Sequence, residues 1–267
     1  MKYILYCLAG LAFSFGIGYL IVSLLCRKKH LSKGKKAGLS ALCGILVIAL
    51  LGLVYLEIYY HADETAMKAL EPDNAVKVEK TGEGYLFDGP GTEKILVFYP
   101  GAKVQTESYA PLMRKLAQNG VDAFLADMPF RMAVFGSNVT DKLSERYEYA
   151  HWYTGGHSLG GVAASGYAAK HADKIEGVVL LASYSTAKFP EGLDALEVYG
   201  TEDKVMNKKA YQDAMMNLWR ISVYEIKGGN HAQFGNYGAQ RGDGTASITA
   251  EEQQNETVKA ILGFMGE

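Results

Sequence analysis

The sequence predicts an α/β fold in which a mostly parallel sheet carries helices on both faces. Short apolar runs alternate with amphipathic segments between residue 76 and the end of the chain, and this alternation is typical of parallel strands joined by crossover helices. Ser158, flanked by glycines, follows one apolar run, and His231 follows a later one. Two long uncharged segments precede this region, and they predict that the N-terminal part of the chain is not part of the sheet.

The apolar runs and helical patterns place the expected elements. The glycines between the first two runs indicate a hairpin at the sheet edge. The continuous run 95–99 is typical of a strand that is covered on both faces, and Thr249 with Glu252 forms a capping box for the last helix. We expect strands at 76–78, 85–87, 95–99, 121–126, 152–155, 175–181, 193–199 and 221–226, and helices over 109–117, 139–150, 159–171, 210–219 and from 249 onward.

The first 60 residues predict a membrane anchor. Residues 3–26 and 37–56 carry no charge, and about 20 apolar residues at ~1.5 Å rise cross the ~30 Å hydrocarbon layer. We therefore expect two transmembrane helices, at about 3–26 and 37–59. A cleaved signal peptide is the alternative for the first, but its apolar run is long and meets Arg27 without a small-residue cleavage site.

The loop between these helices sets the expected orientation. Residues 27–36 contain six Lys or Arg, and such loops stay on the cytoplasmic side. Everything after Tyr60 is then extracytoplasmic, and the cell membrane is the expected location. Tyr55, Tyr59 and Tyr60 fit an aromatic belt at the outer interface. We expect residues 1–60 to form the anchor, 61–75 a stalk, and 76–267 the folded domain.

Composition narrows the partners of this domain. Residues 61–267 carry 20 Lys and Arg against 28 Asp and Glu, a balance that argues against nucleic acid. All three cysteines lie in the uncharged segments, so we expect no disulfide or thiol metal site in the domain. Asp243 alone does not make a metal site. The expected partners are the lipid bilayer, through the hairpin, and a small molecule.

Residues 156–161, Gly-His-Ser-Leu-Gly-Gly, form the most informative stretch. They lie between a predicted strand and a predicted helix, and this strand, turn and helix geometry exposes a serine hydroxyl as a nucleophile. A turn this tight needs glycine at positions 156 and 160, where a Cβ atom would not fit. The helix that follows directs its N-terminal amides toward the reacting oxygen.

An acid and a base are expected at the carboxyl ends of later strands, where open sheets place their ligands. Asp203 follows the run 193–199, and His231 follows the run 221–226. In acyl transfer, His231 would take the proton of Ser158 and return it to the leaving group, and Asp203 would orient His231. Glu202 is the alternative acid. His157, inside the turn, is interpreted as a buried structural residue.

Two backbone amides are expected to form an oxyanion hole. One belongs to Leu159, directly after the serine. The other is expected from Ala102, in the loop 100–103 that follows the early central strand, although Pro100 and Gly101 could also be an ordinary turn. The remaining candidates for substrate contact are Lys103, Met128, Arg131, Phe135 and Phe234.

Four motifs together carry a family resemblance. They are residues 98–104 (FYPGAKV), 156–161 (GHSLGG), 199–203 (YGTED) and 228–235 (GGNHAQFG). They resemble those of α/β-hydrolases, in particular the compact group called fold-5, which is related to dienelactone hydrolases. The resemblance spans residues 95–266 and implies an α/β-hydrolase fold. The runs 121–126 and 152–155 are separated by only 25 residues, so we expect no large lid. Dienelactone hydrolases use a cysteine nucleophile where this chain has Ser158.

The motifs favour one function and leave others open. We expect a membrane-anchored serine hydrolase that cleaves a carboxylic ester or related acyl bond through an acyl-serine intermediate, without metal or organic cofactor. An acyltransferase with the same triad is a close alternative, because an alcohol would only replace water in its second step. A non-catalytic binding or sensor protein on the same fold is the third.

Overall fold

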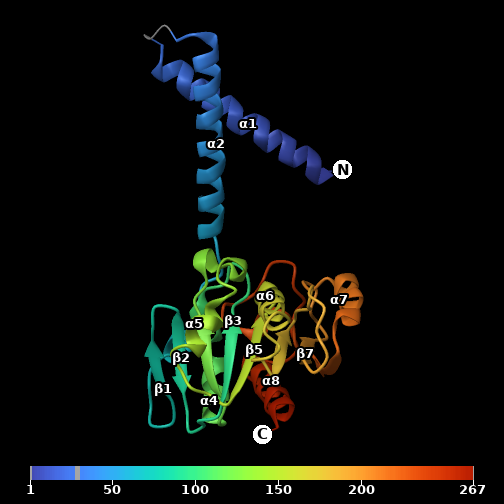
Figure 1. Ribbon diagram of the computed structural model, residues 1–267. Coiled ribbons are helices and arrows are strands. Elements are labelled where there is room, and N and C mark those ends of the chain that lie inside the picture. Colours follow the sequence, from blue (N-terminus) through green and yellow to red (C-terminus); the bar gives the residue numbers. More distant parts are fainter. Residues whose placement is uncertain (1, 28–30, 267) are drawn as a thin grey trace. The chain divides into compact units, whose positions relative to one another are not determined.

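The computed structural model describes residues 2–27 and 31–266, with side chains from Gly10 onward. It divides into two compact units, Met1–Ile58 and Tyr59–Glu267 (Figure 1). The first unit is helical, and the second contains all the strands. The boundary between the units lies directly after Ile58.

Helices α1 (Lys2–Leu25) and α2 (Lys33–Glu57) form the first unit and pack against each other where glycines allow a close approach. A Cβ atom at Gly18 would lie 2.5 Å from the backbone nitrogen of Gly44, and one at Gly44 would lie 2.5 Å from the ring of Phe15. Small residues at such crossings let two helix backbones approach. The two helices therefore come closest around Gly18 and Gly44.

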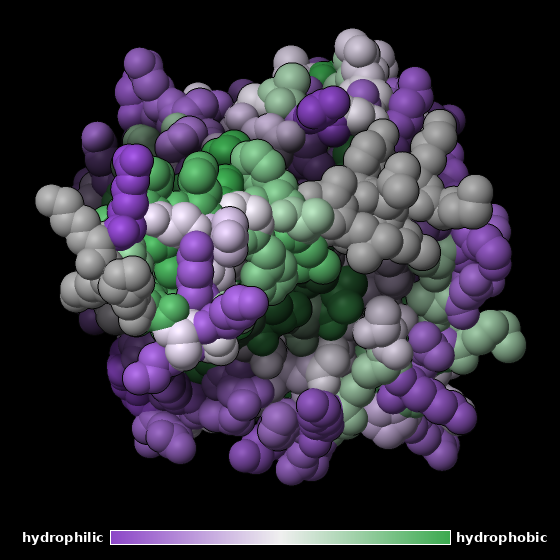
Figure 2. All heavy atoms as spheres, turned by 90° about the horizontal axis from the view of Figure 1, so that it is seen from above, coloured by the Kyte–Doolittle hydropathy of each residue, from purple (hydrophilic) through white to green (hydrophobic). Residues whose placement is uncertain are grey.

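The hydropathy of α2 is that of a membrane-spanning helix. Its 25 residues are long and apolar enough to cross a bilayer, and large hydrophobic side chains are exposed along it and along α1. Figure 2 shows such hydrophobic residues gathered on the face turned to the viewer. In α1 the described apolar part is the shorter segment Gly10–Leu25. The residues before Gly10, and residues 28–30 of the basic loop, lie outside the described side chains, so the second span stays a prediction.

An eight-stranded sheet forms the centre of the second unit, in the order β1-β2-β4-β3-β5-β6-β7-β8. The first two strands form the expected hairpin at the edge, and β2 also pairs antiparallel with β4. Every other neighbouring pair is parallel, which confirms the mostly parallel sheet. The strands are β1 (Lys77–Lys80), β2 (Gly84–Asp88), β3 (Lys94–Tyr99), β4 (Asp122–Ala126), β5 (His151–His157), β6 (Gly177–Leu181), β7 (Asp194–Gly200) and β8 (Arg220–Ile226).

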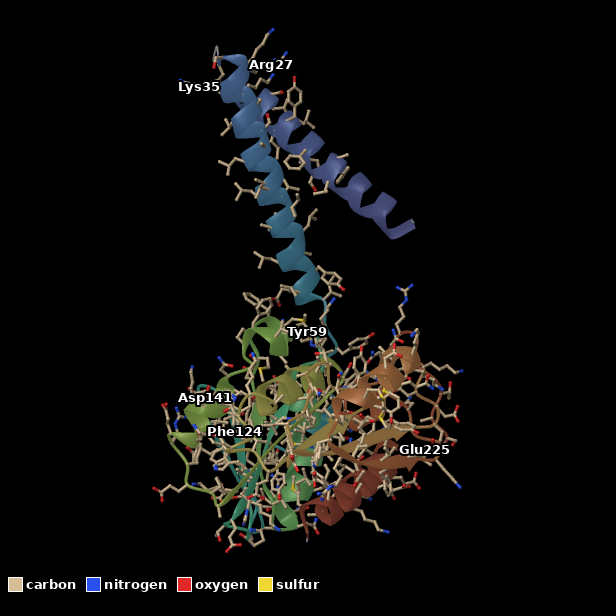
Figure 3. All side chains as sticks on the ribbon, turned by 45° about the vertical axis from the view of Figure 1, so that its right-hand side comes forward. Arg27, Lys35, Tyr59, Phe124, Asp141 and Glu225 are labelled. Atoms are coloured by element: carbon tan, nitrogen blue, oxygen red, sulfur yellow. The ribbon has the colours of Figure 1, made fainter. Side chains whose placement is uncertain are left out.

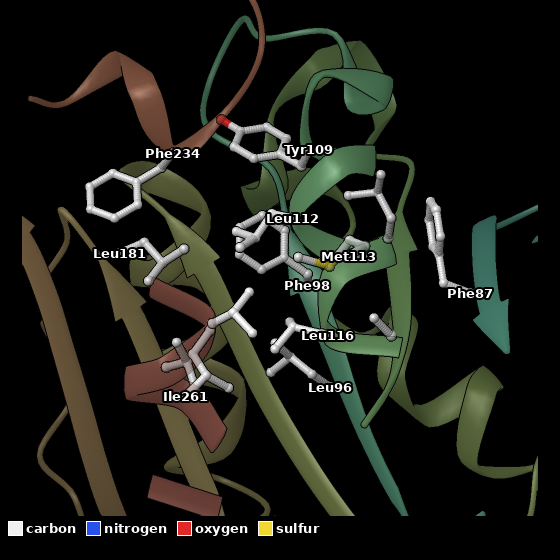
Figure 4. Close-up of a cluster of buried hydrophobic side chains, with 14 of the residues drawn as sticks. Phe87, Leu96, Phe98, Tyr109, Leu112, Met113, Leu116, Leu181, Phe234 and Ile261 are labelled. Atoms are coloured by element: carbon white, nitrogen blue, oxygen red, sulfur yellow. The ribbon is translucent and has the colours of Figure 1, made fainter. Parts of the chain in front are cut away.

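Helices cover both faces of this sheet. Alternate residues of β3 enter different clusters: Leu96 packs with α4 and α8, whereas Val97 packs with α5 and α6. Figure 4 shows the larger cluster, which includes Phe98, Leu112 and, from the last helix, Ile261. The helices are α3 (Glu64–Lys68), α4 (Ala110–Gln118), α5 (Val139–Ser144), α6 (Leu159–Ala168), α7 (Lys208–Ala214) and α8 (Ala250–Met265).

Three helices end earlier than predicted, and one of them, α6, ends at Ala168 instead of residue 171. Helix α5 ends at Ser144 instead of residue 150, because the following segment extends and brings the Tyr149 hydroxyl to Asp122 Oδ2, at 2.7 Å. Helix α7 ends at Ala214 and continues as a 3-10 turn, η4 (Met215–Asn217). The capping box of α8 is present as predicted.

Residues 61–75, expected as a stalk, belong to the second unit. The backbone N–H of Asp63 donates to the Asn236 carbonyl at 2.9 Å. Ala66 of α3 is fully buried, and the Arg114 side chain donates to the Ala69 carbonyl at 2.8 Å. The folded unit therefore begins almost directly after α2.

Candidate active site

Ser158 lies at the tip of the turn between β5 and α6 with a backbone conformation that L-residues rarely adopt. Its φ is 52° and its ψ is −123°. Such a conformation costs on the order of 1–3 kcal/mol and persists only where the surroundings impose it. Here the Ser158 N–H donates to the Leu181 carbonyl at 3.0 Å, and Ser183 Oγ donates to the Ser158 carbonyl at 2.6 Å.

The flanking glycines make this turn possible. A Cβ atom at Gly160 would collide with the backbone carbonyl of Tyr99, and one at Gly156 would lie 2.5 Å from the carbonyl carbon of Gly160. The first turn of α6 therefore packs directly against the end of β3. This is the close approach that the sequence predicted for positions 156 and 160.

Asp203 and His231 form a buried pair at the ends of β7 and β8. Asp203 Oδ2 lies 2.8 Å from His231 Nδ1, and both side chains are almost completely buried. Asp203 Oδ1 accepts the backbone N–H groups of Val205 and Met206 at 2.8 and 2.9 Å. Burial raises the pKa of Asp203, but the hydrogen bond and charge of His231, with the two amides, outweigh it and hold that pKa below its usual value.

Glu202, the alternative acid, forms its hydrogen bond with a residue other than His231. Its carboxylate accepts the hydroxyl of Thr201 at 3.3 Å. The geometry thus favours Asp203 as the partner of His231, because a short side chain in a loop held by its own amides reaches the imidazole directly.

The second ring nitrogen of His231 points away from this pair. Nε2 is buried and has no hydrogen-bond partner among the described residues. His231 and Ser158 line the same cavity, whose volume is about 200 Å³. Proton transfer from the Ser158 hydroxyl requires an imidazole nitrogen that has no other partner, and Nε2 meets this requirement. The other lining residues are Leu159, Val162, Ala182, Ser183, Tyr184, Val205, Met206 and Asn207.

His157 is buried, as predicted, and supports the loop after β3. Its Nδ1 lies 2.8 Å from the hydroxyl of Tyr109, and that hydroxyl accepts the N–H of Gly101 at 3.1 Å. Burial, followed by the nearby charge of His231, lowers the pKa of His157 well below its usual value. An uncharged His157 therefore packs beside the ring of His231, with 4.5 Å between the centroids.

Within the described residues, neither expected oxyanion donor has a backbone acceptor for its amide. Leu159 is the first residue of α6 and lines the cavity. In the loop after β3 the N–H of Gly101 is used by Tyr109, and the N–H of Lys103 donates to the Arg131 carbonyl. The N–H of Ala102, between them, has no acceptor within the part of the chain that the structure describes.

A comparison with protein families decides the classification. The model of the "Alpha/beta hydrolase family" matches residues 95–255, which is more than half of the chain. The chain belongs to the alpha/beta hydrolase family. No curated protein sequence matches this hydrolase.

Solved structures share the fold of this hydrolase at low sequence identity. An esterase from Pyrobaculum calidifontis is 14% identical with a TM-score of 0.55, over 74% of this chain and 87% of its own. Est1E from Butyrivibrio proteoclasticus, with ferulic acid bound, is 14% identical with a TM-score of 0.53, over 74% and 99%. A dienelactone hydrolase from Anabaena variabilis is 16% identical with a TM-score of 0.52, over 72% and 98%. These similarities show the fold.

The five predicted substrate contacts are not among the residues that line the cavity of this hydrolase. Met128 and Phe234 are buried in hydrophobic clusters on opposite faces of the sheet. Phe135 is exposed on the loop after β4, and the Arg131 guanidinium lies 3.5 Å from the ring centroid of Tyr59. Lys103 turns the loop after β3 with a φ of 58°. Met128 and Phe234 thus contribute to the core, and Arg131 contacts Tyr59 instead.

The lining residues that the sequence analysis missed follow the predicted site residues closely. Val162 lies one helical turn after Ser158, and Val205 and Met206 come directly after Asp203. The short distance of these residues from Ser158 and Asp203 along the sequence could have indicated that they line the cavity. Tyr184 comes from the loop after β6. This loop contains no carboxylate at that point, so nothing in its sequence indicated a site residue.

Asp243 and Gln253 hold the loops of the hydrolase site. Asp243 Oδ2 accepts the N–H of Ala232, beside His231, and its Oδ1 accepts the N–H of Lys204, beside Asp203, at 2.9 and 3.3 Å. The buried Gln253 side chain of α8 accepts the N–H of Asn230 and donates to its carbonyl, at 2.9 and 2.8 Å. Asp243 thus connects the loop that carries Asp203 to the loop that carries His231.

Proposed function

We propose that this alpha/beta hydrolase is a membrane-anchored serine hydrolase that cleaves a carboxylic ester or related acyl bond through an acyl-serine intermediate. One observation carries the proposal. His231 binds Asp203 through Nδ1 and presents a buried, unpartnered Nε2 in the cavity that it shares with Ser158. Structural neighbours described as esterases agree with this chemistry.

In the first step, the Ser158 hydroxyl gives its proton to His231 Nε2 while Oγ attacks the acyl carbon of the substrate. Asp203 holds the proton on Nδ1, so that Nε2 is the free base, and it stabilises the imidazolium that forms. The carbonyl oxygen becomes negatively charged in this step. The amides of Leu159 and Ala102 are the donors we assign to it, helped by the N-terminal dipole of α6.

Collapse of the tetrahedral intermediate breaks the bond to the leaving alcohol, which takes the proton from His231 Nε2. A water molecule then gives a proton to His231 and attacks the acyl carbon of the ester on Ser158. His231 returns the proton to Ser158 Oγ as the carboxylic acid leaves. No other titratable group is needed for the cycle.

The anchor proposal extends the finding on α2. Helices α1 and α2 would both span the membrane, with the basic loop 27–36 on the cytoplasmic side and the second unit outside. The six Lys and Arg of that loop support this orientation. The length and composition of α2 support the span itself.

Ester turnover by the full-length protein tests the assignment of nucleophile and base. We expect Ser158→Ala and His231→Ala each to lower kcat on p-nitrophenyl acetate at least about a thousand-fold, because members of a triad act as a unit. His151→Ala, at a partly exposed histidine paired with Glu176, is the matched control and should keep the parent rate. A parent-like rate in His231→Ala would remove it as the base.

A further inference from the structure

The chain enters the second unit at the carboxyl edge of the sheet. Tyr60, two residues after Ile58, forms a parallel bridge with Val104 in the loop after β3. Its N–H donates to the Lys103 carbonyl, and its carbonyl accepts the N–H of Gln105, both at 2.8 Å. The residues that follow α2 are therefore fixed to the end of a central strand rather than linked by a free tether.

The loop after β4 lies beside this entry point. The guanidinium of Arg131 lies 3.5 Å from the ring centroid of Tyr59, within the range of a cation–π contact. The N–H of Lys103 donates to the Arg131 carbonyl at 2.9 Å. Figure 3 shows Tyr59 at the top of the second unit next to this loop. Tyr59 and the loop thus form one rigid surface.

This loop, residues 129–136, exposes large apolar side chains. Phe130, Val134 and Phe135 have 50%, 50% and 61% of their surface exposed, whereas Met128 and Ala133 of the same stretch are buried. The rings of Phe130 and Phe135 meet edge to face at 5.9 Å. The loop therefore holds its base in the core and displays a separate apolar cluster outward, and such clusters mark interaction surfaces.

The backbone is strained where the cluster begins. Phe130 and Arg131 both have positive φ, at 57° and 56°, and each such residue costs on the order of 1 kcal/mol or more. Hydrogen bonds retain this conformation: the Arg131 N–H donates to the Met128 carbonyl at 2.8 Å, and that of Met132 donates to Pro129 at 3.1 Å. Exposure of Phe130 is thus imposed by the fold.

The covalent connection sets the distance to the membrane. Helix α2 ends at Glu57, two residues before Tyr59. Two extended residues reach at most about 7 Å, and the polar interface on each side of the hydrocarbon layer is about 5–8 Å thick. If α2 spans the bilayer, the surface around Tyr59 lies within or directly above this interface, where aromatic side chains are favoured.

We propose that Phe130, Val134 and Phe135 insert into the outer interface of the lipid bilayer. The inference rests on the proposed anchoring by α2. Since Ser158 follows β5 at the same carboxyl edge, this contact holds the site edge of the sheet toward the bilayer. A substrate at the membrane surface would then reach Ser158 without leaving the interface.

Tryptophan quenching by brominated phosphatidylcholine tests the contact. The full-length protein is reconstituted in vesicles, and each single variant is compared with the parent, whose Trp152 and Trp219 give the background. Phe135→Trp reports on the loop. Leu46→Trp, at an exposed position in the middle of α2, reports on the anchor. Met216→Trp is the control for a position in water, because Met216 is 85% exposed and lies before β8 at the opposite edge of the sheet.

We expect the added fluorescence of Phe135→Trp to be quenched by lipids brominated near the headgroup more than by lipids brominated at the chain ends. Leu46→Trp should be quenched most by the latter, and Met216→Trp by neither. Quenching of Leu46→Trp with none in Phe135→Trp would overturn the loop contact and leave the anchor intact. No quenching of Leu46→Trp would overturn the anchor, and the loop contact with it.

Discussion

The Asp203 carboxylate illustrates how single residues define the site. Its two oxygens have separate tasks, because Oδ1 accepts two amides of its own loop and Oδ2 faces His231. The first contact fixes the side chain, and the second fixes the imidazole. Burial raises the pKa of Asp203, but these contacts lower it by more, so that the pKa lies below its usual value. These contacts favour the ionised form of the carboxylate.

Asp203→Asn should therefore lower kcat on p-nitrophenyl acetate by about a hundred- to ten-thousand-fold, because an amide can stabilise the wrong imidazole tautomer and cannot stabilise the imidazolium. Glu202→Gln is the neighbouring control and should stay within about twofold of the parent. Steady-state kinetics on both variants measure the effect. Loss of activity in Glu202→Gln alone would make Glu202 the acid.

Glu197 of β7 is a buried carboxyl group with the opposite behaviour. Burial raises its pKa to about 7, against a smaller lowering by the Tyr211 hydroxyl. The folded protein then retains a proton that the unfolded chain releases between pH 4.5 and 7. The contribution of Glu197 to the free energy of unfolding is thus most favourable below pH 4.5. It decreases as the pH rises from 4.5 to 7 and is constant above this window.

Glu197→Gln should remove this pH dependence. We expect the variant to be more stable than the parent at pH 8 by up to about 3 kcal/mol, since one pKa unit corresponds to about 1.4 kcal/mol. At pH 4.5 the difference should be close to zero. Denaturant unfolding of both proteins at the two pH values measures it, and an equal difference at both would contradict the account.

At the scale of elements, the loops after β7 and β8 are joined to each other by hydrogen bonds to Asp243. Asp243 accepts amides from both loops, and Gln253 of α8 fixes the residue before His231. Neither residue lines the cavity. Their contribution is the position of the imidazole, and small errors in such positions are costly for proton transfer.

Asp243→Ala is expected to lower kcat about ten- to a hundred-fold with a smaller change in KM, because the imidazole is displaced while the cavity keeps its walls. Asp243→Asn keeps one acceptor and should recover part of the rate. Asp213→Ala, which removes an exposed ion pair with Lys209, is the matched control. A rise in KM alone would show that Asp243 acts on binding instead.

The elements could be predicted where the signal is local. The glycine turn, the alternation of strands and the capping box of α8 depend on nearby residues, and the structure contains each of them. The end of α5 depends on the distant contact between Tyr149 and Asp122. The cavity wall depends on three loops that meet only after the sheet forms, so Tyr184 could not be inferred from spacing.

At the scale of the whole molecule, the segment around Tyr60 and the turn at Ser158 lie at the same edge of the sheet. The residues after α2 join the carboxyl edge, and Ser158 follows β5 at that edge. The basic loop and the apolar helices predict which side of the membrane this edge occupies. Hydropathy and charge carry this information in the sequence, whereas the attachment of Tyr60 to the loop after β3 required the structure.

Protease added to intact cells should digest the second unit and leave the loop 27–36 protected, because the proposed orientation places that loop, with its six basic residues, in the cytoplasm. Immunoblots against tags at the C-terminus and in the 27–36 loop follow the two parts. Inside-out vesicles are the control and should give the reverse pattern. Digestion of the loop tag in intact cells would invert the orientation.

The central claim is that Asp203 and His231 make the hydroxyl of Ser158 a nucleophile. Peptide mapping by mass spectrometry, after reaction of the full-length protein with a fluorophosphonate, tests it most directly. We predict one adduct, on Ser158, which is lost in Ser158→Ala and strongly slowed in His231→Ala. An adduct on another residue, or labelling of Ser158→Ala at the parent rate, would contradict the account.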